Sequence, residues 1–484
     1  MDEVDAIVVG SGPNGLAAAV TLARAGLAVR VYEREATIGG GSRTAELTLP
    51  GFHHDVCSAV HPLALASGFF RRFELQRRID LVVPELSYGH PLEGGRAGLA
   101  WRDFDRTVDE LGADGPAYRR LMGPLVDHAD RVAQFAGSSL LQVPRHPLTA
   151  ARFGLRALEQ GSRDWNSRFT EDVAPAMLAG VGAHAIQRMP GLASAAAALS
   201  LGTYAHARGW PIPVGGSQAI VDAMADDLRA HGGIIHTGVD VTSIDDLPPA
   251  RAVLFDVSPA ALLRIAGGRL PLGYARRLAR FRYGNAVAKV DFALSAPVPW
   301  ANVDLRRAGT VHVGGTRAEI AAAEDDVAAG RHSANPYVLV AQPSVGDDFR
   351  APAGQQVLWA YTHVPRGSTL DQTQAVIDRI EHFAPGFRDR ILATASKTAV
   401  DMERENPNYV GGDIAAGAAT FGQLIARPVL STDPWRTPAS GVYLASSSTP
   451  PGPGVHGLAG YYAARSALRH EFGITAGPSL GLGR

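Results

Sequence analysis

The chain has 484 residues, of which 46% are hydrophobic and 19% are charged, and its formal net charge is −1. This length and apolar content are enough to bury a large core, and the charge balance gives no electrostatic case for a nucleic-acid partner. Cys57 is the only cysteine, which excludes a disulfide framework and cysteine-based metal or dithiol chemistry. We expect two domains rather than a string of small modules.

The start of the chain, MDEVD, is acidic where a secretory signal would be basic. No window of about 20 residues is apolar and free of charge, so a membrane-spanning helix is not expected. These two features predict a cytoplasmic protein.

Residues 6–33, AIVVGSGPNGLAAAVTLARAGLAVRVYE, predict a β-α-β unit: a short apolar strand, a helix and a second apolar strand. The glycines suit a bound dinucleotide, since Gly10 permits a tight turn, Gly12 a close backbone approach and Gly15 close helix–strand packing. Free N–H groups at the helix start attract phosphate. Glu33 ends the second strand, where a carboxylate accepts hydrogen bonds from ribose hydroxyls. The segment therefore predicts a dinucleotide site.

The next residues, EREATIGGGSRT at 33–44, extend this pattern. With the preceding unit they resemble the flavoprotein superfamily of phytoene desaturases and monoamine and polyamine oxidases, although one extra small residue precedes Arg43. Small residues let the loop pass close to a pyrophosphate, and Arg43 brings positive charge to it. The resemblance implies FAD rather than NAD. The FAD contacts that we expect here are Gly10, Gly12, Pro13, Asn14, Gly15, Glu33, Arg34, Gly40, Gly41, Ser42 and Arg43.

A group of polar residues follows at PGFHHD, residues 50–55, and at His61. The spacing of these histidines and Asp55 fits no metal-ligand pattern, so no metal is expected. Asp55 is expected to fix the loop as a hydrogen-bond acceptor.

Recurring apolar positions predict a mainly helical region between residues 100 and 210. The expected helices cover 105–111, 117–135, 148–158, 165–177 and 193–204. In the resembled family such helices cap a substrate tunnel. His184 and His206 can then face the tunnel or be ordinary interior histidines with satisfied hydrogen bonds, and we favour the interior placement.

Alternation of helix and strand resumes after residue 210. We expect a helix over 220–231 with Ser217 as its N-cap, followed by strands at 234–237, 239–244 and 252–256. By resemblance, Val241 contacts the adenine and the strand that ends at Asp256 lies near the cofactor. Further on, the sequence predicts strands at 285–294, 337–342 and 356–363 and a helix over 372–383.

The C-terminal segment GVYLASSSTPPGPGVHGLAGYYAAR, residues 441–465, predicts a strand, a loop and a helix. In the resembled flavoproteins this element covers the flavin, and the positive helix end stabilises the anionic reduced ring. Gly454, Gly457 and Gly460 leave room for a flat ring. A second GxGxxG begins at Gly452, but too little chain remains for a second nucleotide domain. The expected FAD contacts here are Gly454, Val455, His456 and Gly457.

Two side chains are candidates for catalysis. Lys289 lies in a predicted strand that resembles the amine-oxidase strand whose lysine holds a water against flavin N5, where an ammonium assists hydride chemistry or reoxidation. Its alternative is a lysine on the solvent face of the strand. His456 is a candidate for proton transfer beside the flavin. The other lysine, Lys397, is expected on the surface.

The predicted fold is α/β, with a discontinuous Rossmann-type FAD-binding domain and a second, α+β substrate domain. The FAD domain is expected to comprise residues 1–75, 210–265 and 435–475, and the substrate domain residues 76–209 and 266–434.

By resemblance, the leading functional hypothesis is hydride transfer from a largely apolar substrate to flavin N5, which desaturates, dehydrogenates or isomerises a C=C system. The alternatives are a flavin amine oxidase that uses O2 and a flavin-binding protein without turnover. The substrate, the electron acceptor and the oligomeric state are left open, as is peripheral membrane contact, which a carotenoid-like substrate would require.

Overall fold

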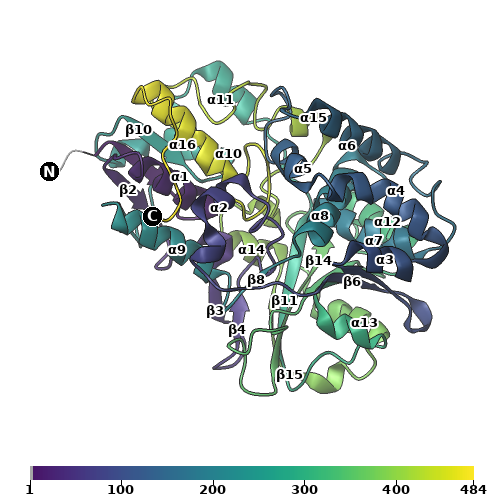
Figure 1. Ribbon diagram of the computed structural model, residues 1–484. Helices are drawn as coiled ribbons and strands as arrows, with labels where there is room; N and C mark the ends of the chain where they lie inside the picture. The colour runs from purple at the N-terminus through teal and green to yellow at the C-terminus, as the bar shows by residue number, and fades with distance from the viewer. Residues whose placement is uncertain (1–3, 484) are drawn as a thin grey trace.

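The computed structural model describes residues 4–483, so the acidic start at residues 1–3 falls outside the described residues. Two sheets organise the chain (Figure 1). The first is a five-stranded, fully parallel sheet in the order β16-β10-β1-β2-β9. Its strands are β1 (Ala6–Val9), β2 (Val29–Tyr32), β9 (Ile234–His236), β10 (Ala252–Phe255) and β16 (Val442–Leu444). The carboxyl ends of parallel strands meet at one edge, where α/β folds bind ligands.

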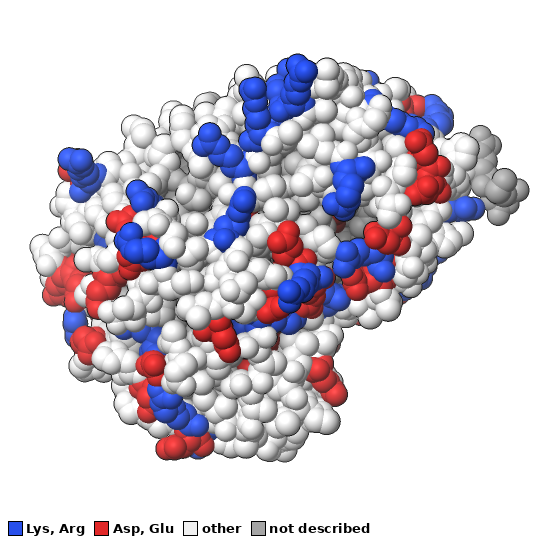
Figure 2. Space-filling view, turned by 180° about the vertical axis from the view of Figure 1, so that it is seen from behind, with Lys and Arg blue, Asp and Glu red and all other residues white. Residues whose placement is uncertain are grey.

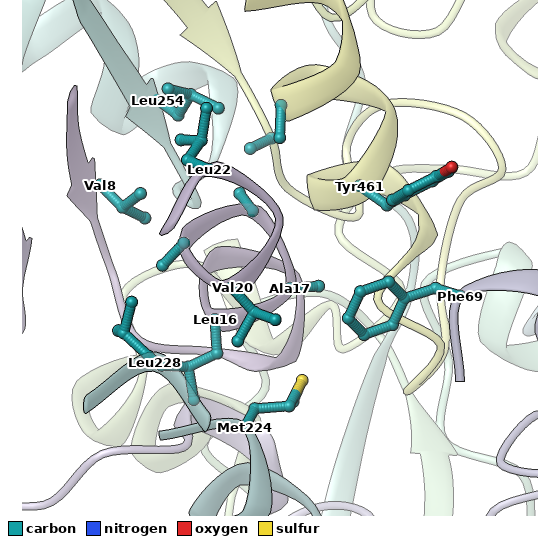
Figure 3. Close-up of a cluster of buried hydrophobic side chains, with 14 of the residues drawn as sticks. Val8, Leu16, Ala17, Val20, Leu22, Phe69, Met224, Leu228, Leu254 and Tyr461 are labelled. Atoms are coloured by element: carbon teal, nitrogen blue, oxygen red, sulfur yellow. The ribbon is translucent and has the colours of Figure 1, made fainter. Parts of the chain in front are cut away.

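Three helices pack on this sheet: α1 (Pro13–Ala23), α9 (Gln218–Ala230) and α16 (Leu458–Glu471). The central helix α1 is buried along almost its whole length because α9 and α16 flank it. Leu16 and Leu228 join Val8 and Leu254 in one apolar cluster (Figure 3). The buried sheet and its two flanking helices thus fix the position of the α1 N-terminus.

The second sheet has seven strands in the order β15-β11-β14-β13-β12-β6-β7. Neighbouring strands are antiparallel except for β12 and β6, which are parallel. These strands are β6 (Leu86–Pro91), β7 (Ala97–Trp101), β11 (Ala286–Leu294), β12 (Ala308–Val313), β13 (Val338–Ala341), β14 (Gln356–Val364) and β15 (Ile391–Lys397). Two short two-stranded sheets pair β3 (Thr44–Glu46) with β4 (His53–Asp55) and β5 (Leu81–Val82) with β8 (Ile212–Pro213).

Helices of the middle of the chain pack beside the second sheet (Figure 1). They are α3 (Phe104–Glu110), α4 (Gly115–Val126), α5 (Ala129–Ala136), α6 (Pro147–Gln160), α7 (Val173–Gly182), α8 (Leu192–Ala207), α12 (Arg317–Ala328) and α13 (Thr373–Phe383). The remaining α-helices are α2 (Gly68–Phe73), α10 (Pro259–Ala266), α11 (Leu272–Leu278), α14 (Ala399–Glu405) and α15 (Phe421–Ile425). This arrangement confirms the predicted α/β class with a Rossmann-type parallel sheet and an additional mixed α/β part; the predicted domain boundaries stay a prediction.

Several predicted elements differ from the structure. The helix expected over 117–135 is two helices, α4 and α5, and the helix expected over 165–177 begins only at Val173. Residues 239–244 do not form a strand, because the N–H of Val239 donates to the carbonyl of Glu33 (2.9 Å) just past the end of β2. Ser217 does not cap α9 with its side chain, since its hydroxyl donates to the carbonyl of Ser58 (2.6 Å).

Candidate functional site

A cavity of about 610 Å³ lies at the carboxyl ends of β1, β2 and β10 and extends toward the second sheet and helix α8. Its volume is in the usual range for small-molecule sites. Most of the predicted site residues line it, whereas the cofactor contacts Gly15 and Gly457 and the catalytic candidate Lys289 do not. The predicted residues on its wall are Gly10, Gly12, Pro13, Asn14, Glu33, Arg34, Gly40, Gly41, Ser42, Arg43, Val241, Gly454, Val455 and His456.

The glycine turn is closed by a carboxylate from the neighbouring strand. Asp256 follows β10, and its Oδ2 accepts a hydrogen bond from the N–H of Gly15 (2.8 Å) in the first turn of α1. A Cβ on Gly12 would lie 2.7 Å from the same oxygen, and a Cβ on Gly15 would lie 2.1 Å from the carbonyl oxygen of Gly10. Gly15 therefore serves helix–strand packing, as predicted, and Gly12 leaves space beside Asp256.

Glu33 is held in place at the cavity wall. Its carboxylate accepts hydrogen bonds from the N–H and hydroxyl of Ser11 (2.9 and 2.6 Å) and from the N–H of Glu35 (2.9 Å). Three donors orient the two oxygens, which retain lone pairs for a further donor such as a ribose hydroxyl. Ser11 was absent from the predicted set; its place inside the glycine motif was the available signal.

The polar groups at the start of α1 fit an anionic dinucleotide. In the first turn of α1, Pro13 has no N–H and the Gly15 N–H donates to Asp256, while the N–H of Asn14 has no acceptor among the described residues. Asn14 Oδ1 and Ser42 Oγ are buried without a hydrogen-bond partner, and both residues line the cavity. Buried polar atoms without a partner are costly unless a ligand satisfies them. These groups match the phosphate, ribose and amide groups of FAD.

The guanidinium of Arg43, which was predicted to bring charge to a pyrophosphate, forms contacts within the chain. Its Nε donates to the carbonyl of Gly40 (2.9 Å), and its Nη2 pairs with Glu405 (3.1 Å). Glu405 also pairs with Lys397, whose side chain is 20% exposed, so this lysine is partly buried and paired rather than fully exposed on the surface. The reason is that β15 places Lys397 against α14, which carries Glu405.

Asp256 is the main wall residue that the predicted contact set omitted. Burial raises its pKa to about 7, and the nearby charge of Glu33 acts in the same direction, while the hydrogen bond from Gly15 opposes both. A carboxyl group that titrates near neutral pH thus lies at the helix end that attracts phosphate. The sequence placed the end of this strand near the cofactor by resemblance but gave the Asp256 side chain no role.

The C-terminal loop is internally hydrogen-bonded around His456. Its Nδ1 accepts from the N–H of Leu458 (2.9 Å), and its Nε2 lies 3.0 Å from the carbonyl oxygen of Gly452. Burial lowers the pKa of His456 to about 4, so the ring is neutral and donates through Nε2. Both ring nitrogens are therefore engaged within the loop, which favours a structural role over proton transfer.

The glycines of this loop serve two purposes. Gly454 lines the cavity. A Cβ on Gly457 would lie 2.5 Å from the Phe69 ring, and a Cβ on Gly460 would lie 1.7 Å from the carbonyl oxygen of Asn14. These two glycines bring α16 close to α2 and α1, and so position the loop that carries Gly454.

Lys289 is buried in β11 and pairs with Asp291 on the same strand. Burial lowers the pKa of this ammonium, whereas Asp291 acts in the opposite direction. Its Nζ lies 5.7 Å from the ring centroid of Trp359, and Trp359 lines the cavity. Lys289 is thus neither on the solvent face nor on the cavity wall, but contacts that wall through an aromatic ring.

Asp55 has the predicted role. It accepts hydrogen bonds from the Thr44 hydroxyl (2.8 Å), the Ser217 N–H (2.8 Å) and Arg350 Nη1 (2.9 Å). It thereby ties β4 to the start of α9 and to a buried arginine. Within residues 4–483, no three His, Cys, Asp or Glu side chains are grouped so that they could hold a metal ion.

The two histidines left open by the sequence differ. His206 is interior, with its ring nitrogens near the carbonyl oxygen of Trp101 (2.7 Å) and the hydroxyl of Tyr118 (2.9 Å). His184 instead lines the cavity, so the interior placement was wrong for it; it follows α7, and its Nε2 lies 2.9 Å from Nε2 of His312 on β12. Burial lowers the pKa of His184 to about 3.

An aromatic wall was not predicted. Trp359 and Tyr361 of β14 line the cavity with their rings at nearly right angles, at a centroid distance of 5.1 Å. Tyr409 joins them, and a Cβ on Gly41 would lie 2.1 Å from its hydroxyl oxygen. Cys57 also lines the cavity, and burial raises the pKa of its thiol, which keeps it protonated. The alternation of residues along β14 could not predict which face of this strand lines the cavity.

Comparisons with known proteins agree with this geometry. A family profile described as "NAD(P)-binding Rossmann-like domain" matches residues 8–73. The chain is 28% identical to the rat (Rattus norvegicus) pyridine nucleotide-disulfide oxidoreductase domain-containing protein 2, over 96% of this chain and 94% of that protein. Over 25% of each chain it is 30% identical to the 4,4'-diapolycopen-4-al dehydrogenase of Metabacillus indicus.

Among solved structures, the cyclohexylamine oxidase of Brevibacterium oxydans aligns with a TM-score of 0.57 at 17% identity, over 97% of this chain and all of that chain. Together the comparisons show a Rossmann-type nucleotide-binding domain at the start of the chain and, over nearly its whole length, the two-part fold of the amine-oxidase type of oxidoreductase. The expected cofactor, FAD, agrees with this fold.

Proposed function

We propose that this oxidoreductase removes a hydride from a largely apolar organic substrate, and so desaturates, dehydrogenates or isomerises a C=C system. The observation that carries the proposal is the chemistry of the cavity beyond the glycine loops. Alanines of α5 and α8, Leu201, Trp210, Leu339 and Ala341 line that part. Among the described residues, the acidic ones on the cavity wall are Glu33, Glu35, Asp240 and Asp256 near the glycine turn, and Glu405, whose carboxylate already pairs with Arg43 and Lys397.

A protonated amine would need a carboxylate or a comparable partner at this depth, because an unpaired buried charge is costly. The two titratable histidines of this part, His61 and His184, are neutral, since burial lowers their pKa values to about 4 and about 3. The wall therefore suits a substrate that contributes apolar area rather than charge.

In this proposal the chain's own residues position and desolvate the reactants. FAD, when bound, supplies the hydride acceptor. Ser11 orients Glu33 at the dinucleotide end, and Trp359 and Tyr361 exclude water from the other end. The relative from Metabacillus indicus supports the apolar substrate class, because the substrate in its name is 4,4'-diapolycopen-4-al. That likeness covers a quarter of this chain.

The aromatic wall favours a second candidate, a flavin amine oxidase. Trp359, Tyr361 and Tyr409 lie close to one another on the cavity wall and could bind an amine through their ring faces. Tyr461 and Tyr462 of α16 do not line the cavity. The cyclohexylamine oxidase likeness shows the fold alone.

Anaerobic mixing separates the candidates. The purified, FAD-loaded protein is mixed without oxygen with an apolar polyene or polyene aldehyde, and in parallel with aliphatic and cyclic amines. Bleaching of the flavin absorbance by a polyene supports the proposal. Bleaching by an amine, with hydrogen peroxide formed on readmission of air, supports the oxidase. Photoreduction with no bleaching by either panel supports the third alternative, a flavin-binding protein without turnover.

A further inference from the structure

An unusually apolar surface lies next to the substrate end of the cavity. The loop after α5 and the outer side of α6 expose six large aliphatic side chains, which we call the α6 surface: Leu140, Leu141, Val143, Leu148, Leu155 and Leu158. The two most exposed of these side chains are Val143 at 92% and Leu148 at 75%. Soluble surfaces rarely gather this many large apolar side chains without a partner.

Helix α6 carries apolar side chains both on its buried side and on its exposed side. Phe153 and Ala157 face the core, while Leu148, Leu155 and Leu158 face outward at helical spacing. Packing within the chain explains the inner side only. The outer side therefore needs an apolar environment that the described residues do not provide.

The charges of this segment have one sign. Arg131, Arg145, Arg152 and Arg156 lie between residues 131 and 158, where the sequence has no acidic residue. The nearest acids on either side are already paired, Asp130 with Arg71 and Arg208, and Glu159 with Arg168. Arg145 and Arg152 are exposed and have no ion pair among residues 4–483.

The same end of the molecule contains the apolar part of the cavity. Ala133, Ala136 and Gly137, at the end of α5, line the cavity immediately before the exposed loop begins. Leu424 of α15 lines it as well, and Phe421 of the same short helix is 63% exposed. Figure 1 shows α5, α6 and α15 together at the upper right of the molecule.

We propose that the α6 surface docks on an anionic lipid bilayer, so that an apolar substrate passes between the bilayer and the cavity. Exposed leucines interspersed with unpaired arginines are the pattern by which an interfacial helix binds anionic lipid. A second copy of the chain is the other possible occupant. A two-fold contact through this face would set arginines against arginines, which opposes it. No helix among residues 4–483 is long and apolar enough to cross a membrane, so the contact would be peripheral.

Vesicle binding tests the proposal on the FAD-loaded full chain without substrate, so that its failure is distinguishable from failure of the proposed reaction. The protein is sedimented with vesicles of phosphatidylcholine plus phosphatidylglycerol and with vesicles of phosphatidylcholine alone. We expect binding to the anionic vesicles, weaker binding to the neutral ones, and release as salt concentration rises.

The variants locate the contact. Leu148→Ser with Leu155→Ser should weaken binding about tenfold or more, because each leucine contributes buried apolar area. Arg145→Gln with Arg152→Gln should weaken it about 25-fold, at about fivefold per arginine. The matched control is Leu370→Ser with Leu392→Ser, two leucines that are 52% and 46% exposed elsewhere, and it should bind like the wild type. None of these side chains lines the cavity, so FAD content should be unchanged in every variant.

Three results would overturn the proposal. One is no binding to anionic vesicles, and another is an equal loss in the control variant. The third is a wild-type dimer, measured by light scattering, that the α6 variants convert to a monomer while vesicle binding is unchanged; that result would assign the surface to a second copy.

Discussion

Lys289 and Lys397, the only two lysines in the chain, are cross-strand partners on β11 and β15. Like charges directly opposite each other on a sheet are unfavourable. Each ammonium here has its own carboxylate, Asp291 for Lys289 and Glu405 for Lys397. The pairing explains why two lysines can coexist at this place, and it gives Lys289 a structural role that the sequence did not reveal.

Replacing Lys289 should therefore act first on stability. Lys289→Met leaves Asp291 buried without its partner, and we expect the free energy of unfolding to fall by about 3–5 kcal/mol. Lys289→Met combined with Asp291→Leu removes both charges and should recover most of that loss. Urea unfolding of the two variants measures this difference. Unchanged stability in Lys289→Met, together with slower reoxidation of the reduced flavin by oxygen, would instead support the catalytic lysine.

Asp256 should make FAD binding pH-dependent. Because burial raises its pKa to about 7, the carboxyl is mostly neutral at pH 6 and mostly ionised at pH 8. Ionisation places negative charge beside the helix end that attracts phosphate, so affinity for FAD should fall as pH rises through this range, by at most about tenfold per pH unit.

The measurement is FAD titration of the apoprotein across pH 6 to 8, followed by flavin fluorescence. Asp256→Asn keeps the acceptor for the Gly15 N–H but cannot ionise, so its affinity should be flat over the same range. Glu33 is the other carboxylate that acts on this group, and its charge raises the pKa of Asp256, so Glu33→Gln should shift the wild-type curve to lower pH without flattening it. An Asn variant as pH-dependent as the wild type would rule out Asp256.

Gly460 should tolerate no side chain. A Cβ at this position would lie 1.7 Å from the carbonyl oxygen of Asn14, a backbone atom that cannot move without shifting α1. Gly460→Ala should lower stability by about 1–3 kcal/mol and reduce the FAD content of the purified protein. The control is Gly268→Ala, where a Cβ meets nothing within 4 Å. Thermal unfolding that is equal for the two variants would show that α16 does not pack on α1 in this way.

The ends of the chain were predictable from sequence because their chemistry is local. The turn at Gly10 and Gly12, the packing glycine Gly15 and the carboxylate Glu33 occupy fixed places in one β-α-β unit. The cavity beyond them was not predictable in the same way. Asp256 and Trp359 reach the cavity only because β10 lies beside β1 and because β14 turns one face toward the cofactor part.

The wrong prediction for residues 239–244 has the same cause, a contact between segments that are distant in the sequence. Residues 239–244 carry a strand-like pattern, but backbone hydrogen bonds from residues 238 and 239 to the end of β2 draw the segment across the sheet edge. His456 lines the cavity, and its place beside the flavin stays a prediction; loop closure takes up both ring nitrogens, which opposes the predicted proton transfer. The net charge of −1 is spread over the surface: Figure 2 shows basic and acidic side chains interspersed over much of the rear face, with several basic ones along the upper edge.

The central claim is that one FAD molecule binds between the glycine turn at the start of α1 and the C-terminal loop before α16. The most direct test is the absorbance spectrum of the purified protein, followed by denaturation and identification of the released chromophore by mass. We predict a flavin spectrum and about one FAD per chain. A colourless protein that also fails to bind added FAD would contradict the account.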